Sequence, residues 1–542
     1  MLRQAVLDQP VPSVEHRRRA IEATPLPANM GALIDAAAAA APDRLAWNFF
    51  ESGETMTFAG LRVAVNRLAA GLAAAGVRKG THVAVMLPNV AAFPLTWLAL
   101  ARLGAVMVPM NVAYTPREIA YVVEDGDVEW AVVDATCLAG FAPPPGRLAA
   151  ERIFVVGEAT PGHRAWETLG DGQPDDFAAP EPVGHDDLLN IQYTSGTTGL
   201  PKGCMLSQRY WLQAGLVNAR RDGRDYERIL AATPFFYMDP QWLLTMALWL
   251  RATLFVARRQ SATRFMGWVR ERRIQFTLFP AIVVKQPPDL RDPDNEIVRV
   301  NVYGLPKHEH AELERRFDFV AREAYGMTEI GSGMFMPIEA VDMVGSGSCG
   351  IPSPFREARI VGADGRPVPP GGEGELEIRG PGMLHGYYKN PEATEAAFHD
   401  GWFRTGDLFR QDARGYFHIV GRIKDMIRRA GENIAAREVE AVLGALPEVR
   451  EAAVVPVPDP VRGEEVKAYV VLQPGLTRDE VPPERILGHC AAGLARFKVP
   501  RYLAYRDAFP KTPSEKIAKR LLVQGESDLR TDSWDRVEGR WR

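Results

Sequence analysis

One short segment carries many of the residues that could do chemistry. Residues 193–203 read YTSGTTGLPKG and combine three glycines, five hydroxyl side chains and one lysine. Glycine permits backbone angles that other residues resist. A loop rich in N–H groups and hydroxyls can wrap a polyphosphate, and a lysine can pair with its charge. The spacing differs from the GxxxxGK[ST] loop, so we interpret the segment as a phosphate-binding loop of another kind rather than a surface turn.

Two later segments add groups that a bound nucleotide could use. YGMTE (325–329) offers Glu329, which can hold Mg²⁺, and Thr328, which can bond a phosphate oxygen. The alternative is a helix that begins here with Thr328 as its cap. RTGD (404–407) ends in Asp407, whose two carboxylate oxygens suit a vicinal diol. Its alternative is a turn residue after glycine.

The glycine-rich loop resembles the signature loop of the adenylate-forming superfamily, which contains acyl-CoA synthetases, peptide-synthetase adenylation domains and luciferases. Four later segments resemble further family motifs in the family's order, and they are YGMTE (325–329), WFRTGD (402–407), GRIKDMIRRAGENI (421–434) and PKTPSEKI (510–517). The resemblance covers residues 30–520. It implies an acid–thiol ligase that joins a carboxylic acid to AMP and passes the acyl group to CoA, using ATP and Mg²⁺.

The resemblance also implies roles for individual residues. The residues implied to bind the cofactors are Thr194, Ser195, Gly196, Thr197, Thr198, Gly199, Lys202, Gly304, Tyr325, Asp407, Arg422 and Gly431. The implied catalytic residues are Lys516, Thr328 and Glu329, of which Glu329 is also the implied metal ligand. The acid is expected to meet Tyr237, Trp242 and Gly326, and Lys424 matches the hinge position.

Several positions depart from the family pattern. Tyr237 stands where a histidine or another aromatic residue is usual, and tyrosine is not a base near neutral pH. In VYGLPK (302–307) only Gly304 and Pro306 match the family's adenine-side loop. The family commonly has glycine at two further positions. Here they hold Glu515, which precedes the implied catalytic Lys516, and Ala430, which precedes Gly431.

These departures, together with three further segments, most resemble the branch that holds carnitine/crotonobetaine-CoA ligases. The segments are FPAIVVKQPP (279–288), EEVKAYVVL (464–472) and ARFKVPRYL (495–503). Residues 235–242 supply aromatic rings and Asp239, which could cage a cationic head group. An aromatic-lined apolar pocket with Asp239 capping a helix is the commoner arrangement, and we favour it.

Composition limits the classes of protein to consider. A chain of 542 residues exceeds one ordinary core, so at least two domains are expected. The net charge of −4 gives no bulk attraction to nucleic acid or to an acidic membrane. Four scattered cysteines form no CxxC pair, which favours a reducing compartment over a zinc or disulfide scaffold. The start lacks a secretory pattern, so we expect a cytoplasmic enzyme, with a homodimer left open.

The pattern along the chain predicts an α/β fold. Apolar runs at 81–87, 105–111 and 129–135 alternate with helical patterns at 92–105 and 116–125, which indicates parallel sheets covered by helices. The apolar stretches Phe93–Tyr114 and Trp242–Val256 contain arginines, so we interpret each as a buried helix plus strand rather than a membrane span.

Later segments predict a different organisation. Residues 358–380 alternate around Gly and Pro turns, which predicts antiparallel hairpins in a β-rich subdomain. We expect a large N-terminal domain over 1–421 and a small mobile α+β domain over 422–542, joined at 422–425, with a polar tail after 525 that frays.

Two apparent motifs carry little weight. GSGSCG (345–350) matches GxGxxG but follows no clear strand, so we interpret it as a turn. KHEH (307–310) begins a charged helical stretch, and we expect a solvated helix face rather than a metal site.

Three rival functions remain open. The chain could load a carrier protein, although no carrier domain with an attachment serine is evident. It could catalyse one half-reaction alone, as the altered adenine-side loop suggests. It could also bind nucleotide without catalysis, but such a protein would need neither Lys516 nor Glu329.

Overall fold

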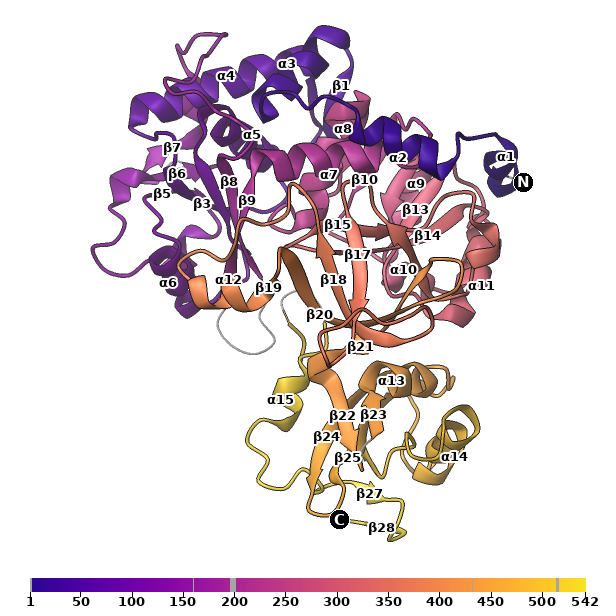
Figure 1. Ribbon diagram of the computed structural model, residues 1–542. Helices are drawn as coiled ribbons and strands as arrows, with labels where there is room; N and C mark the ends of the chain where they lie inside the picture. Colours follow the sequence, from indigo (N-terminus) through magenta and orange to yellow (C-terminus); the bar gives the residue numbers. More distant parts are fainter. Residues whose placement is uncertain (1, 159, 195–200, 431, 513–515) are drawn as a thin grey trace. The chain divides into compact units, whose positions relative to one another are not determined.

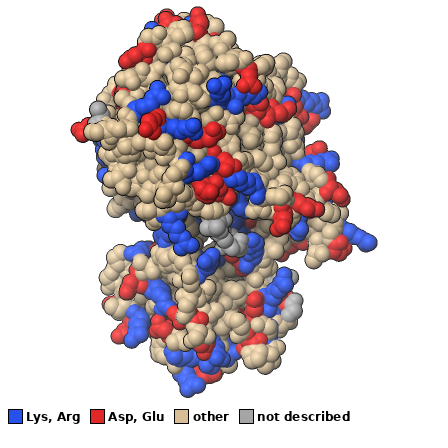
Figure 2. All heavy atoms as spheres, turned by 90° about the vertical axis from the view of Figure 1, so that its left-hand side faces the viewer, with Lys and Arg blue, Asp and Glu red and all other residues tan. Residues whose placement is uncertain are grey.

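The computed structural model describes residues 2–158, 160–194, 201–430, 432–512 and 516–542 (Figure 1). These residues fall into two compact units. The first consists of Met1–Thr194, Pro201–Glu357 and Ile378–Gly401, and the second of Ala358–Glu377 and Trp402–Arg542. Acidic and basic side chains are interspersed over the face seen in Figure 2, in keeping with a net charge of −4.

One sheet of the first unit confirms the predicted alternation of strands and helices. Its order is β7 (Arg164–Ala165), β6 (Ile153–Val156), β5 (Trp130–Asp134), β3 (His82–Met86), β4 (Val106–Pro109), β8 (Leu188–Thr194) and β9 (Lys202–Ser207). The central strands β3, β4 and β5 are parallel. The helices α5 (Ala92–Leu103) and α6 (Pro116–Asp125) follow β3 and β4, as expected. Parallel strands need such crossover helices because the chain must return to the same edge.

A second sheet in the first unit is mostly parallel. Its order is β16 (Ser348–Pro352), β15 (Gly331–Phe335), β14 (Val320–Met327), β13 (Arg299–Val302), β12 (Phe276–Leu278), β10 (Arg228–Ala231), β11 (Thr253–Val256), β1 (Leu45–Phe49) and β2 (Glu54–Thr57). Its neighbours in the sequence include the helices α7 (Gln208–Arg220), α8 (Met238–Leu250), α9 (Phe265–Glu271), α10 (Ala281–Val284) and α11 (Lys307–Phe317). The apolar stretch from Trp242 to Val256 is therefore a helix plus a strand, as expected.

One helix in the first unit has the length and composition of a membrane span. Among the described residues, α4 (Phe58–Ala75) alone reaches that threshold, and half of it is buried. Its buried side chains recur every three or four residues, at Phe58, Leu61, Val65 and Leu68, and α3 (Met30–Ala40) and α5 pack against it. This pattern is that of a helix packed into a protein core.

The solvated face expected for KHEH is only partly present. The segment does begin a helix, α11, but His310 is 4% exposed and its Nε2 lies 3.0 Å from the carbonyl oxygen of Ala321. Burial lowers the pKa of this imidazole. The expectation was wrong for His310 because the helix turns that residue inward against β14.

The second unit contains strands of two sheets. β17 (Glu357–Val361), β18 (Glu373–Arg379), β20 (Trp402–Gln411) and β21 (Phe417–Arg422) are consecutive neighbours in one. The other has the order β23 (Glu432–Ala435), β22 (Met426–Arg429), β25 (Gly463–Leu472), β26 (Tyr502–Tyr505), β27 (Trp534–Asp535) and β28 (Arg540–Trp541), with β24 (Val449–Asp459) antiparallel to β25. Helices α13 (Ala436–Gly444) and α14 (Pro483–Gly493) contribute to its apolar core.

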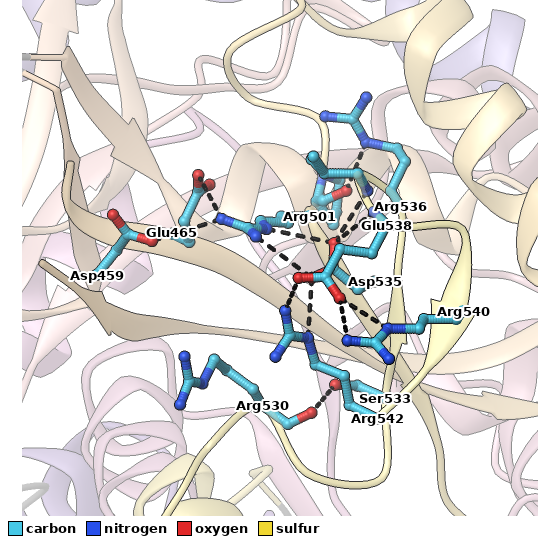
Figure 3. Close-up of polar contacts among 12 residues, drawn as sticks. Asp459, Glu465, Arg501, Arg530, Ser533, Asp535, Arg536, Glu538, Arg540 and Arg542 are labelled. Atoms are coloured by element: carbon cyan, nitrogen blue, oxygen red, sulfur yellow. Dashed lines mark hydrogen bonds and ion pairs between the residues drawn. The ribbon is translucent and has the colours of Figure 1, made fainter. Parts of the chain in front are cut away.

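The polar C-terminal tail does not fray as expected. β27 pairs with β26 and β28 pairs with β27, both antiparallel. Asp535 is fully buried and accepts from Arg501 at 3.3 Å and from Arg542 at 2.9 Å, as Figure 3 shows. The prediction was wrong because ion pairs, cross-strand bonds and the ring contacts of Trp534 and Trp541 order this segment.

Candidate active site

The stem of the glycine-rich loop is an antiparallel strand pair. β8 ends at Thr194 and β9 begins at Lys202, and these two residues are register partners. The hydroxyl of Thr194 donates to the carbonyl of Lys202 at 3.4 Å. Ser195, Gly196, Thr197, Thr198 and Gly199 lie outside the described residues, as does Gly431. The predicted exit of the loop from a strand is confirmed.

Helix α6 holds both sides of this stem. The hydroxyl of Tyr193 donates to Oδ2 of Asp125 at 2.5 Å, and the hydroxyl of Tyr121 donates to the carbonyl of Pro201 at 2.9 Å. Burial first, and Asp125 second, raise the pKa of Tyr193, so it remains a donor. A Cβ on Gly203 would lie 2.6 Å from Ile191 and 3.2 Å from the Tyr193 ring. Glycine at 203 therefore permits close packing of the stem.

Tyr387 links two of the predicted site residues. The ammonium of Lys202 lies 3.8 Å from the centroid of the Tyr387 ring, and the Tyr387 hydroxyl donates to Oε1 of Glu329 at 3.0 Å. Glu329 is 7% exposed and Tyr387 is 4% exposed. Sequence reasoning missed Tyr387, whose segment MLHGYYKN showed no chemical pattern. The arrangement places a cation and a carboxylate on one aromatic side chain.

The segment YGMTE forms the end of a strand and a turn. β14 ends at Met327, and residues 328–330 turn the chain into the antiparallel β15. The alternative of a helix N-terminus at Thr328 is therefore wrong. A Cβ on Gly326 would lie 2.6 Å from the carbonyl oxygen of Gly331, so the tight return requires glycine there. Tyr325 and Thr328 are both half-buried.

The altered adenine-side loop has its own anchor. Gly304 has φ +65°, a conformation that favours glycine. The N–H groups of Gly304 and Leu305 donate to the two carboxylate oxygens of Glu323, at 3.2 and 2.9 Å. Glu323 is buried on β14, two residues before Tyr325. One carboxylate thus connects this loop to the strand that leads into YGMTE.

The predicted acid-side residues lie at the start of α8. Tyr237 is the N-cap residue, and its hydroxyl accepts from Nδ2 of Asn111 at 3.1 Å. The indole N–H of Trp242 donates to Asp239 at 3.1 Å. Asp239 lies in the first turn of α8, whereas we expected it to cap the helix.

In the second unit, two residues that are predicted to bind the nucleotide are cross-strand partners. Asp407 on β20 is opposite Arg422 on β21, with Arg422 Nε 2.9 Å from Asp407 Oδ1. Asp407 is 2% exposed, while Arg422 is exposed. Lys424 is exposed and lies in the one-turn helix Ile423–Asp425 that follows β21. The pairing brings together residues that lie in two separate sequence motifs.

Lys516 lies near two other lysines in the sequence, Lys511 and Lys519. Its backbone N–H donates to Thr512 Oγ1 at 3.2 Å, its carbonyl accepts from the Thr512 N–H at 2.7 Å, and its residue surface is exposed. Lys511 forms an ion pair with Glu451. Lys519 lies 2.7 Å from Glu440. These two lysines are thus engaged with carboxylates of their own unit.

Ala430 explains why glycine is usual at its position. Its φ is +51°, in the left-handed region that L side chains rarely adopt. Its N–H donates to the carbonyl of Arg462 at 2.8 Å, which fixes the turn between β22 and β23. Alanine there carries a strain of about 1–2 kcal/mol.

Two family models match this chain. The model of the AMP-binding enzyme family matches residues 34–388, and that of the AMP-binding enzyme C-terminal domain matches residues 438–516. A feruloyl-CoA synthase from Amycolatopsis sp. is 35% identical over 86% of this chain and 93% of the relative. A sulfoacetate–CoA ligase from Cupriavidus necator is 33% identical over 91% and 97%. A crotonobetaine/carnitine–CoA ligase from Citrobacter koseri is 32% identical over 87% and 95%.

Solved structures of similar enzymes also match this chain along most of its length. ATP-bound MatB from Rhodopseudomonas palustris is 27% identical, with a TM-score of 0.80 over 91% of this chain and 98% of that chain. The o-succinylbenzoate CoA synthetase of Bacillus subtilis, solved with its acyl-adenylate, is 25% identical, with a TM-score of 0.78 over 92% and 98%. The latter enzyme has also been solved with ATP and a magnesium ion.

Proposed function

Because the chain belongs to the AMP-binding enzyme family, we propose that it is an acid–thiol ligase that activates a carboxylic acid with ATP and transfers the acyl group to CoA. The observation that carries the proposal is the group formed by Lys202, Tyr387 and Glu329, which combines a phosphate-pairing cation and a carboxylate at one place. The similar CoA ligases support the choice of CoA as acceptor.

The proposed reaction has two steps. A carboxylate oxygen of the acid attacks the α-phosphorus of ATP, and the bond to pyrophosphate breaks, which leaves an acyl-adenylate. The thiolate sulfur of CoA then attacks the acyl carbon, and the bond to AMP breaks. The mixed anhydride is itself the activated species, so no serine or cysteine nucleophile of the protein is required.

Four predicted residues of the first unit would act in the first step. Glu329 would hold Mg²⁺, which commonly takes one or two carboxylates and completes its shell with phosphate oxygens and water. That metal would neutralise phosphate charge as pyrophosphate departs. Lys202 pairs with a phosphate, Thr328 donates to a phosphate oxygen, and Tyr325 stacks near adenine. The loop residues outside the described part would add N–H and hydroxyl donors.

The second unit would contribute the remaining contacts. Asp407 accepts from the ribose hydroxyls, and Arg422 contacts the nucleotide beside it. Lys516 stabilises the charge that builds on the α-phosphate and on pyrophosphate. We place the domain boundary and hinge at 422–425, which falls between the two family matches, with Lys424 at the hinge and Gly431 beside the pantetheine arm.

The proposal gives the substrate only as a carboxylic acid, and an assay would identify which acid it is. We expect pyrophosphate release from ATP with at least one acid of a panel of hydroxycinnamates, short sulfonated acids, betaines and aliphatic acids. AMP and a new thioester should accumulate only when CoA is added. Release of pyrophosphate without thioester formation would favour the single half-reaction. Transfer to a carrier protein but not to CoA would favour the carrier-loading alternative.

A variant of Lys516 tests whether the chain activates an acid or only binds the nucleotide. Lys516→Ala should lower acid-dependent pyrophosphate release by about 10²–10³-fold while the variant still binds ATP. Absence of pyrophosphate release with every acid, from a folded wild-type enzyme that binds ATP, would contradict the proposal and favour the non-catalytic alternative.

A further inference from the structure

The segment Thr233–Tyr237, which joins β10 to α8, is held by side-chain amides. Asn89 donates to the carbonyl of Thr233 at 2.9 Å and accepts from the N–H of Phe235 at 2.8 Å. Gln241 donates to the carbonyl of Phe235 at 2.9 Å and to that of Tyr237 at 3.2 Å. The remaining bonds are Gln192 to the carbonyl of Phe236 at 2.8 Å and Asn111 to the hydroxyl of Tyr237 at 3.1 Å.

We call Asn89, Asn111, Gln192 and Gln241 the amide frame. All four side chains are buried, with exposures between 0% and 7%. Burying a backbone carbonyl without a hydrogen-bond donor destabilises the fold. The frame therefore fixes the path of the segment through neutral hydrogen bonds, and it places no net charge beside Tyr237.

The amide frame also connects this segment to the strand of the glycine-rich loop. Gln192 lies on β8, two residues before Thr194. Asn190, on the same face of that strand, donates to Oε1 of Gln241 at 2.9 Å. Its own Oδ1 accepts from the indole of Trp97 at 2.9 Å. Each amide thus orients the next, so β8 and the start of α8 form one hydrogen-bonded unit.

We infer that Gln192 and Gln241 are positioning residues. They fix the position of Tyr237 and thereby determine which acids the enzyme accepts. The inference rests on the proposed function, in which Tyr237 borders the acid. Neither glutamine needs to touch the acid, because both act through backbone carbonyls of residues 235–237. A shift of about 1 Å in such a segment can alter reactivity by about 10²-fold.

The test compares two acids on the same enzyme. For wild type and Gln192→Met, kcat/KM of pyrophosphate release is measured with the best acid of the panel and with its homologue one methylene longer. Methionine keeps the length of the side chain and removes both hydrogen-bonding groups. We expect the ratio of the two kcat/KM values to fall about tenfold, since one methylene is ordinarily discriminated by about 10–200-fold.

A matched control comes from another buried glutamine. Gln208 is fully buried, accepts from the N–H of Met30 at 2.9 Å and donates to the carbonyl of Ala101 at 3.0 Å. Within the described part of the chain, Gln208 forms no hydrogen bond with residues 233–237. Gln208→Met should therefore lower the melting temperature and keep the ratio of the two kcat/KM values within about twofold of wild type. A ratio within one preparation does not depend on the fraction of folded enzyme.

Gln241→Met provides a second test if Gln192→Met folds poorly. The inference is overturned if both variants keep the wild-type ratio, or if Gln208→Met lowers the ratio as much as they do. A loss of activity that is equal for both acids would mean that the amides support folding alone. Failure of the wild type to activate any acid would instead contradict the proposed function, and the two failures are thus distinguishable.

Discussion

The hydroxyl of Tyr387 donates to Oε1 of Glu329 at 3.0 Å, and both side chains are buried. Burial first, and Glu329 second, raise the pKa of Tyr387, so the phenol keeps its proton throughout the pH range of an assay. The same ring lies under the ammonium of Lys202. Tyr387 is thus able to orient the carboxylate that we propose as the metal ligand.

Tyr387→Phe separates the hydroxyl from the ring. The ring contact with Lys202 remains, but Glu329 loses a hydrogen bond of a kind that contributes about 1.5–3 kcal/mol. We expect the Mg²⁺ concentration for half-maximal pyrophosphate release to rise about tenfold, and Mg²⁺-dependent binding of a non-hydrolysable ATP analogue to weaken in calorimetry. Tyr388→Phe is the control, because the Tyr388 hydroxyl donates to Asp127 instead. Equal effects in the two variants would contradict the assignment.

Glu329→Gln tests the metal role directly. The amide keeps the shape of the side chain and removes the negative charge that attracts Mg²⁺. We expect weak activity at limiting Mg²⁺, partial recovery at high Mg²⁺ and a smaller Mg²⁺ dependence of nucleotide binding. Full activity of this variant at limiting Mg²⁺ would exclude Glu329 as the ligand.

Lys516→Ala should separate the two half-reactions. Negative charge builds on the departing pyrophosphate only in the first half-reaction, so losing this cation should cost about 3–4 kcal/mol, or a factor of about 10²–10³, in that step. Conversion of supplied acyl-adenylate and CoA to the thioester should stay near the wild-type rate. Lys511→Ala, which removes a lysine paired with Glu451, serves as the control. An equal fall in both half-reactions would refute the separation.

Tyr237→Ala should change the acid profile. The variant removes the ring at the start of α8 and the acceptor of the Asn111 bond, while the loop stem at Thr194 and Lys202 is untouched. We expect larger acids to gain relative to smaller ones, with the KM of ATP within about twofold of wild type, since a pocket discriminates by its fit. An unchanged acid profile with impaired ATP binding would place Tyr237 on the nucleotide side.

Lys467 predicts a pH dependence of stability in the second unit. It is 1% exposed, donates to the carbonyls of Leu529 and Thr531, and has its pKa lowered to about 8 by burial and then by Arg506. The unfolded chain titrates this lysine near 10.4. Between these values the unfolded state binds more protons, so the free energy of unfolding rises with pH. Below pH 8 the penalty of burying the charge is fully present.

Lys467→Met removes this titration and leaves the rest of the chain unchanged. The free energy of unfolding in urea is measured for wild type and for Lys467→Met at pH 7 and at pH 10. The change in the difference between the two proteins from one pH to the other gives the contribution of Lys467. We expect wild type to gain stability relative to Lys467→Met as the pH rises through that window. A difference that stays constant with pH would show that Lys467 has an ordinary pKa.

The sequence alone determined the class of the enzyme and several of its elements. The motifs from residue 193 to residue 517 indicated the adenylate-forming family, and the family matches confirm it. Periodicity predicted α5, α6 and strands β3 to β5, because local apolar patterns and crossover lengths specify such units. The roles of Lys516, Asp407 and the other individual site residues remain predictions.

Only the tertiary structure revealed the partners of these residues. Tyr387 lies 58 residues after Glu329, and Gln192 lies 44 residues before Phe236, so no local pattern connects them. The ordered tail and the buried His310 were mispredicted for the same reason. Their hydrogen bonds and ion pairs join strands and helices distant in sequence, and a polar residue shows its burial only when the fold has placed its partner beside it.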